Sequence, residues 1–301
     1  MFLSAFSLLM ALCLSASAQP DPAKPAEPAA EPPPPKYKDL QPPTADEILK
    51  GKPVDWIVLL NGDVIMTDPV QPRPGTLEKI KAQHDAVSKQ AVSAKDLPDK
   101  LKKLAELEKL KITLFDSADD PEFTLELRFI ERIVHFEDLI VRRISKTLDE
   151  RQLPTAYELL MFLDRRARGW DGFNAVYQRF LFLEATRLAK ETRWEAALLQ
   201  TELLFDVDRT YPELSPLHGR ITDALIKQAV ADDDYRQARH FLARLESGEP
   251  AHVVVETWTT ELKRIGDDII TQARAAQAAG KPRDASLTID RAARVWSNLP
   301  R

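Results

Sequence analysis

The second half of the chain carries small and apolar residues in a pattern that repeats about every 40 residues, and this period limits the folds open to it. Four alanines anchor the pattern at spacings of 41, 41 and 47 residues: Ala156, Ala197, Ala238 and Ala285. Seven positions after the anchors stand Leu163, Leu204, Leu245 and Ala292, and twelve before them stand Ile144, Ala185, Ile226 and Ala273. Four positions after stand Leu160, Thr201, Leu242 and Ile289, and nine before the last three anchors stand Leu188, Ala229 and Ala276. Because offsets of three, four and seven share one face of an α-helix, these residues are predicted to be buried together.

Short breaks divide each repeat into two helices: "ERQLP", "KETR", "ADDD" and "AGKP". Residues 137–301 are therefore predicted to form antiparallel helix pairs of about 40 residues each, the size of a solenoid repeat. Trp194 and Tyr235 stand three residues before their anchors. An aromatic residue placed before a small one resembles the second half of a degenerate tetratricopeptide repeat, and the resemblance runs from Glu137 to Asn298. It implies a solenoid, and a plain helical bundle is the alternative.

The stretch "IVLLNGDVIM", Ile57 to Met66, predicts a β-hairpin ahead of the helices. Asn61-Gly62 favours a two-residue type I′ turn, which would pair Leu59 with Val64 and Ile57 with Met66. A lone hairpin is not stable in water, so more strands are expected. The segments "KITLF" and "EFTLEL", starting at Lys111 and Glu122, provide them, and "FIERIVHF", starting at Phe129, is expected either to add a fifth strand or to start a helix. Residues 54–136 are predicted to form a small antiparallel barrel or sheet, similar in size to an SH3 or Sm domain.

A lysine-rich insertion, at about residues 76–110, interrupts this β-unit. Both "TLEKIKAQHDAVSKQAV" and "LPDKLKKLAELEKL" have helical spacing, and Pro98 suits the first turn of the second helix. The insertion is predicted to be a mostly solvated helical hairpin. The whole fold is thus expected to be mainly α: a tetratricopeptide-like solenoid of helix pairs, preceded by a small antiparallel β-barrel or sheet with a helical insertion.

The first 18 residues have the features of a signal peptide. An apolar segment ends in Ala16-Ser17-Ala18, an A-x-A site that predicts cleavage after Ala18. An uncleaved anchor is the alternative. Cys13, the only cysteine, lies in this segment, so the mature chain would hold no disulfide. The proline-rich residues 19–53 are predicted to be a disordered spacer, with order beginning near Val54. The protein is therefore expected in the periplasm or outside the cell, with no transmembrane segment after cleavage.

The sequence contains few of the residue patterns that are typical of catalytic, metal-binding or nucleic-acid-binding sites. Its net charge of −5 provides no basic excess for nucleic acid or for anionic membranes. It contains no Walker loop, G-x-G-x-x-G or G-x-S-x-G motif. His135, Glu137 and Asp138 lie close together in "VHFED", but adjacent side chains point apart, so we expect helix-start charges there and no metal. In "ADDDY", Asp233 or Asp234 is expected to cap the helix that follows. No catalytic, cofactor-binding or metal-binding residue is predicted.

Three short motifs resemble the N-terminal region of bacterial exported proteins that serve as substrate-binding proteins of ABC transporters. They are "VLLNGDVI" at 58–65, "HFEDL" at 135–139 and "AYELL" at 156–160. In that family a dipeptide-type binding domain follows, whereas this sequence ends at Arg301. The resemblance implies a link to peptide uptake, either as a stand-alone relative or as part of a longer protein.

Together these features predict a non-enzymatic exported scaffold that binds a protein or peptide in the cell envelope through the surface of its helical repeats. An accessory role in a peptide-type ABC uptake system is expected, with no cofactor. One alternative is a hydrolase acting on envelope material, with Glu137 at the β–α junction. Another is a truncated solute-binding subunit. A pocket lined by converging polar groups would favour the hydrolase.

Overall fold

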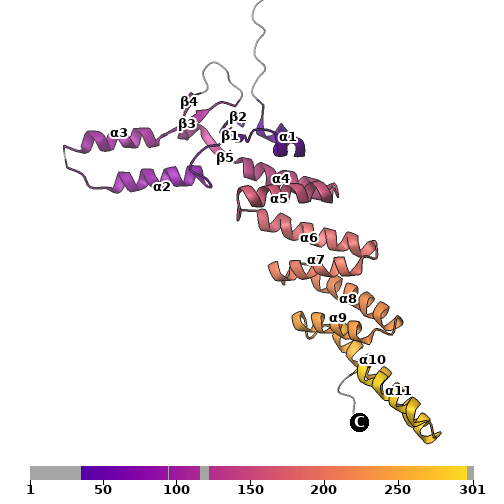
Figure 1. Ribbon diagram of the computed structural model, residues 1–301. Helices are drawn as coiled ribbons and strands as arrows, with labels where there is room; N and C mark the ends of the chain where they lie inside the picture. The colour runs from indigo at the N-terminus through magenta and orange to yellow at the C-terminus, as the bar shows by residue number, and fades with distance from the viewer. Residues whose placement is uncertain (1–34, 94, 116–121, 297–301) are drawn as a thin grey trace, which may run out of the picture. The chain divides into compact units, whose positions relative to one another are not determined.

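The computed structural model describes residues 35–93, 95–115 and 122–296, and within them the chain is mainly helical with a small antiparallel β-unit (Figure 1). The predicted signal peptide and its cleavage site lie outside the described residues. No helix in the described part is long and apolar enough to cross a membrane.

Among the described residues, the β-unit contains five strands: β1 Asp55–Leu59, β2 Val64–Thr67, β3 Lys109–Thr113, β4 Glu122–Glu126 and β5 Ile130–Val134. One antiparallel sheet has the order β2-β1-β5, and β3 pairs with β4 in a second. Backbone bonds from Asp68 N to Thr113 O (2.9 Å) and from Phe115 N to Met66 O (3.0 Å) join the two sheets. A 3₁₀ turn, Leu127–Phe129, leads from β4 into β5. The small antiparallel unit predicted from the sequence is therefore present.

The hairpin turn differs from the predicted one by a residue. The register pairs Val58 with Val64 and Trp56 with Met66, so the loop has three residues instead of two. Gly62 takes a φ of 83°, whereas Asn61 does not have a positive φ. This is a type I turn with a bulge at Gly62, and the predicted type I′ turn is wrong. The Asn61 side chain explains the difference, because its Oδ1 accepts the Asp63 N–H at 3.0 Å.

A one-residue slip moves side chains to the other face of a strand. The predicted partners of Leu59 and Ile57, Val64 and Met66, therefore lie on the opposite face. That face holds the cluster of Trp56, Val58, Val64, Val134 and Leu139, with Leu139 coming from the first repeat helix. Ile57 instead packs with residues of the second sheet and the insertion, among them Leu77, Ile80, Leu110 and Ile112. Both faces of the hairpin are thus covered.

The insertion is a helical hairpin, as predicted, formed by α2 (Thr76–Lys89) and α3 (Leu97–Leu107). Leu77 and Ile80 of α2 are buried in the β-unit, whereas α3 has no buried residue. Lys100 Nζ donates to the carbonyls of Ser88 and Gln90, both at 2.7 Å, and so holds the start of α3 against the end of α2.

The predicted disordered spacer is wrong in its second part. Residues 37–39 form a 3₁₀ turn, and α1 spans Ala45–Lys50. Thr44 and Glu47 make a capping box that starts α1, because each side chain bonds the backbone N–H of the other. Ile48 is buried, with 1% of its surface exposed, against the first helix pairs. Order thus begins before Val54.

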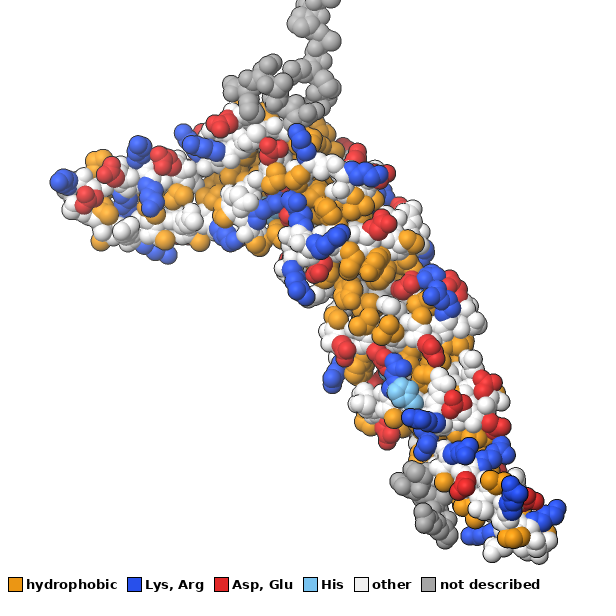
Figure 2. All heavy atoms as spheres, viewed as in Figure 1, with side chains coloured by type: hydrophobic (Ala, Val, Ile, Leu, Met, Phe, Trp, Pro, Cys, Tyr) orange, Lys and Arg blue, Asp and Glu red, His pale blue; other side chains and the backbone are white. Residues whose placement is uncertain are grey.

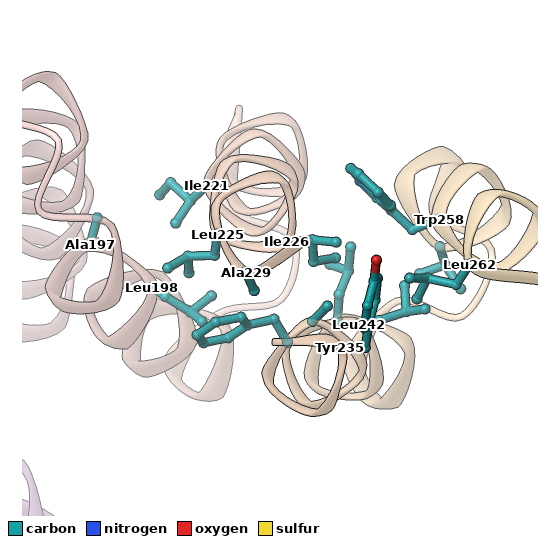
Figure 3. Packing of buried hydrophobic residues seen from close by; sticks show 14 of the residues in the cluster. Ala197, Leu198, Ile221, Leu225, Ile226, Ala229, Tyr235, Leu242, Trp258 and Leu262 are labelled. Carbon is teal, nitrogen blue, oxygen red and sulfur yellow. The ribbon is translucent and has the colours of Figure 1, made fainter. Parts of the chain in front are cut away.

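Eight helices follow, in four pairs: α4 (Phe136–Asp149) with α5 (Leu153–Arg166), α6 (Phe173–Lys190) with α7 (Trp194–Val207), α8 (Leu214–Ala231) with α9 (Tyr235–Gly248), and α10 (Val253–Ala278) with α11 (Pro282–Val295). All four anchor alanines are buried, and so are the residues seven after and twelve before them. Figure 3 shows two of the anchor-related residues, Ala197 and Ile226, in the core shared by neighbouring pairs. Two predicted core positions are wrong: Ile289 is 53% exposed, and Ala276 is only half-buried.

The two helices of each pair are joined by the same three-residue turn. Its middle residue is left-handed in every pair, with φ between 55° and 73°: Arg151, Thr192, Asp233 and Gly280. In the second pair, Thr192 N bonds Ala189 O at 3.2 Å and Arg193 N bonds Leu188 O at 3.0 Å. The other turns repeat these bonds, which define a Schellman ending of the first helix. The repeat therefore extends from side-chain spacing to backbone conformation.

Candidate functional site

Two grooves of nearly equal size lie at equivalent positions on successive helix pairs. The first, of about 530 Å³, is bounded by α5 and α7 and floored by α6. It is lined by Arg151, Leu153, Pro154, Tyr157, Phe180, Glu184, Arg187 and Gln200. The second, of about 520 Å³, has the same relation to α7, α9 and α8. It is lined by Thr192, Arg193, Trp194, Glu195, Ala196, Leu225, Gln228, Ala229, Asp232, Asp234, Gln237 and Phe241.

The 41-residue period relates these grooves residue by residue. The paired positions are 151 and 192, 153 and 194, 154 and 195, 184 and 225, 187 and 228, and 200 and 241. Each groove opens where a second helix begins, beside the left-handed turn. The two grooves thus follow from the repeat of the helix pairs.

The grooves differ in their chemistry. In the first, the exposed ring of Tyr157 lies 5.8 Å from the ring of Phe180. Arg187 there donates to Glu184 and Glu191, and these hydrogen bonds raise the pKa of its guanidinium above the ordinary value. The second groove is lined by the half-buried Trp194 and by three carboxylates, from Glu195, Asp232 and Asp234. An aromatic surface beside fixed polar groups is suited to holding a peptide segment.

Helix α7 forms the ridge between the grooves, and its outer face is apolar. Leu199, Leu203 and Val207, at positions i, i+4 and i+8, expose 52%, 38% and 43% of their surface. Hydrophobic side chains reach the visible surface over the middle helices (Figure 2). The charged residues beside the stripe are acidic, and Glu202 among them binds Arg244 of α9 through both carboxylate oxygens. The positions equivalent to Leu199 and Leu203 in α9 are His240 and Arg244, so the apolar stripe is particular to α7 within these two repeats.

A second candidate lies at the β–α junction, where the sequence drew attention to "VHFED". Asp55 of β1 is completely buried and accepts backbone N–H groups from Val70 and Phe136, both at 2.8 Å. Arg73 also donates to it, and His135 Nδ1 lies 3.2 Å away. Burial by itself would raise the pKa of Asp55. The hydrogen bonds of His135, Val70 and Phe136 and the charge of Arg73 outweigh it and lower that pKa below its ordinary value.

Glu137 is 4% exposed and is held between two arginines. Its Oε1 accepts from Arg73 Nη1 at 3.2 Å and from Arg166 Nε at 3.1 Å. Asp138 points elsewhere and accepts the His135 N–H (3.0 Å) and the Trp170 indole N–H (2.8 Å). Arg73 thus contacts both His135 and Glu137, whereas Asp138 has different partners. Among the described residues, no group of three histidine, cysteine or carboxylate side chains is arranged to hold a metal ion.

Asp55 and Arg73 complete this buried cluster, and the sequence analysis missed both. Phe136 is the first residue of α4, so the Asp55 carboxylate satisfies one of the free N–H groups at the start of that helix. The sequence signal that could have indicated Asp55 was an acidic residue at the start of an otherwise apolar strand, "DWIVL". The cluster ties the β-unit to the first helix pair.

One serine, one histidine and one glutamate also meet where α8 begins. Glu249 accepts from Ser215 Oγ and lies 3.1 Å from His218 Nδ1. The serine is bonded to the carboxylate and not to the imidazole, which is not the arrangement that activates a nucleophilic hydroxyl.

Of the predicted caps in "ADDDY", Asp234 is the one that caps α9, through the Gln237 N–H at 3.0 Å.

Comparison of the sequence with protein-family models and with curated proteins, and of the chain with solved structures, gave no match.

Proposed function

We propose that the protein is a non-enzymatic scaffold that binds a protein or peptide segment through the surface formed by α5, α7 and α9. The observation that carries this proposal is the pair of equivalent grooves of about 520 and 530 Å³. A ligand that crosses the α7 ridge would enter both grooves and cover the apolar stripe between them. Repeated grooves on stacked helix pairs are the usual means by which such repeats hold extended partners.

The wider setting is part of the same proposal. The helix pairs would form a tetratricopeptide-like solenoid, and the chain would be exported to the periplasm or beyond through cleavage after Ala18. An accessory role in a peptide-type ABC uptake system agrees with the three short motifs and with a peptide-sized groove. A solute-binding subunit, of which this chain is a part, is the alternative that shares these features.

The hydrolase alternative receives less support at the residue it depends on. Glu137 would have to reach a substrate, yet its side chain is 5% exposed and its Oε1 is bound by two arginines. A catalytic carboxylate must lie within hydrogen-bond reach of the substrate. The geometry around Glu137 is better explained by the joining of β-unit and helices.

A displayed library of random peptides, selected on the full chain, tests the proposal. Peptides that bind should lose at least about tenfold in affinity when Gln228→Arg or Gln237→Arg fills the second groove, which corresponds to about 1.4 kcal/mol. Gln272→Arg, at an exposed position on α10, makes the same chemical change away from the grooves and should leave the affinity unchanged. Selection that enriches no peptide, or peptides that bind all variants equally, would contradict the proposed surface.

A further inference from the structure

Helix α3 of the helical hairpin begins with an apolar stripe that the described chain leaves about half exposed. All of α3 lacks a buried residue, and Leu97 and Leu101, one turn apart, expose 46% and 57% of their surface. Leu104 and Leu107 of the same helix are half-buried, and Leu107 packs against the core of the β-unit. Leu97, Leu101 and Leu104, at positions i, i+4 and i+7, share one helix face, so this apolar stripe is partly covered toward the end of α3 and exposed at its start. Single exposed leucines are common, but two in a row on a helix with no buried residue call for an explanation.

The same end of the hairpin is positively charged. From Val87 to Ala105 the chain has five lysines and two aspartates, a net charge of +3 in a protein of net charge −5. Lys89, Lys95, Lys102 and Lys103 are exposed, and none of them is paired with a carboxylate within the described residues. Lysine and hydrophobic side chains both reach the surface of this arm (Figure 2). Since charges more than about 10 Å apart are largely screened at physiological salt, the acidic remainder of the chain does not cancel this local field.

We propose that this hairpin docks on the surface of an anionic phospholipid bilayer. Leu97 and Leu101 would enter the boundary between headgroups and acyl chains, and the lysines would lie at the level of the phosphates. A helix with exposed leucines and flanking lysines is the pattern of such interfacial binding. The negative potential of an anionic leaflet attracts each lysine near its surface. This site is separate from the grooves between α5, α7 and α9, and the proposal does not depend on them.

Two observations favour a lipid surface over a protein partner. The exposed stripe is two leucines long, whereas a stable protein interface buries about 800 Å² on each partner. The hairpin is also preformed: Lys100 fixes the start of α3 on the carbonyls of Ser88 and Gln90, and α2 is anchored in the β-unit by Leu77 and Ile80. Little conformational entropy is then lost on docking, so a small apolar contact assisted by charge is sufficient.

Co-sedimentation with vesicles tests the proposal. The chain from Gln19 onward is used, since the apolar residues 1–18 would themselves partition into lipid. We expect at least fivefold tighter binding to vesicles of phosphatidylcholine with 30% phosphatidylglycerol than to pure phosphatidylcholine, and loss of that binding in 0.5 M salt. Leu101→Ser and the double change Lys102→Ala with Lys103→Ala should each weaken binding at least fivefold.

The matched controls lie on α11 and at the residue just before it, far along the sequence from α3. Leu287→Ser removes a leucine of similar exposure, 61%, and Lys281→Ala removes an exposed lysine. Neither should change vesicle binding. Equal binding to neutral and anionic vesicles, absence of binding, or equal losses from the α3 and α11 changes would overturn the proposal. Concentration-dependent self-association that Leu101→Ser abolishes, without vesicle binding, would do so as well, because it would assign the stripe to a second copy of the chain.

Discussion

At the scale of single residues, the left-handed turn within each helix pair lowers the stability of the protein by an amount that depends on which residue adopts it. Glycine adopts this conformation freely, and Gly280 occupies it in the last pair, whereas Thr192 occupies it in the second with φ of 58°. A β-branched residue with positive φ is strained, so we expect Thr192→Gly to stabilise the protein by about 1 kcal/mol. Gly280→Ala should destabilise it by a similar amount. Urea denaturation of both variants checks the pair, and a destabilising Thr192→Gly would contradict the common turn geometry.

Asp55 provides a second test at this scale, through pH. Its pKa is lowered in the folded protein, so its stabilising contribution is complete above the unfolded value of about 3.9 and is lost as pH falls through the folded pKa. Asp55→Asn removes one of the two buried carboxylates that Arg73 binds and should cost about 3 kcal/mol at pH 7. The difference between wild type and variant should shrink below about pH 4. Denaturation at pH 7 and pH 3 measures it, and an identical difference at both values would show that the charge of Asp55 is not what matters.

At the scale of elements, the helix register can be tested with one substitution made at two positions. Ala238 is completely buried, whereas Ala243, on the same helix α9, is exposed. Ala238→Arg should therefore cost about 3 kcal/mol or more, because it overfills the helix crossing and buries a charge. Ala243→Arg should change stability by less than about 0.5 kcal/mol. Thermal melts that find the two changes equally harmful would refute the register.

The helix pairs could be predicted because their signal is local and repeated. Ala156, Ala197 and Ala238 recur at the same spacing, and each is completely buried. The prediction was wrong at Ile289 on α11, which packs on α10 and α9 and has no later helix to cover it within the described residues.

Features that depend on particular side-chain contacts could not be predicted from the hydrophobic pattern. The hairpin register was set by the Asn61 side chain bonding the Asp63 N–H, against the usual preference of Asn-Gly. The sequence around Ile48 was typical of a spacer, and the burial of Ile48 depends on helix pairs that lie far along the chain. Each groove of the candidate site is formed by three helices. In the sequence, only the spacing of the repeat indicates that the lining positions of the two grooves are equivalent.

At the scale of the whole molecule, the segment before β1 contacts both structured parts. Lys36 Nζ pairs with Asp63 of the β-unit at 2.7 Å, and α1 packs on the first helix pairs through Ile48. From α4, Arg143 donates to the carbonyls of Pro42 and Pro43. A segment that bonds two parts at once stabilises each of them and makes their unfolding more cooperative.

Removal of this segment is the last prediction. A chain that begins at Val54 loses the burial of Ile48, worth about 1.5–3 kcal/mol, and leaves an apolar surface on the helices exposed. It also loses the Arg143 hydrogen bonds, at about 1 kcal/mol or more each. We therefore expect it to be less stable than the chain from Gln19 by about 3 kcal/mol or more, with a broader unfolding transition. A chain that begins at Pro35 keeps α1 and all its contacts, so it should match the chain from Gln19 within about 0.5 kcal/mol. Urea unfolding followed by far-ultraviolet circular dichroism compares the three. If the chain from Pro35 were destabilised as much as the chain from Val54, the loss would not come from α1, and residues 35–53 would not be what joins the β-unit to the helices.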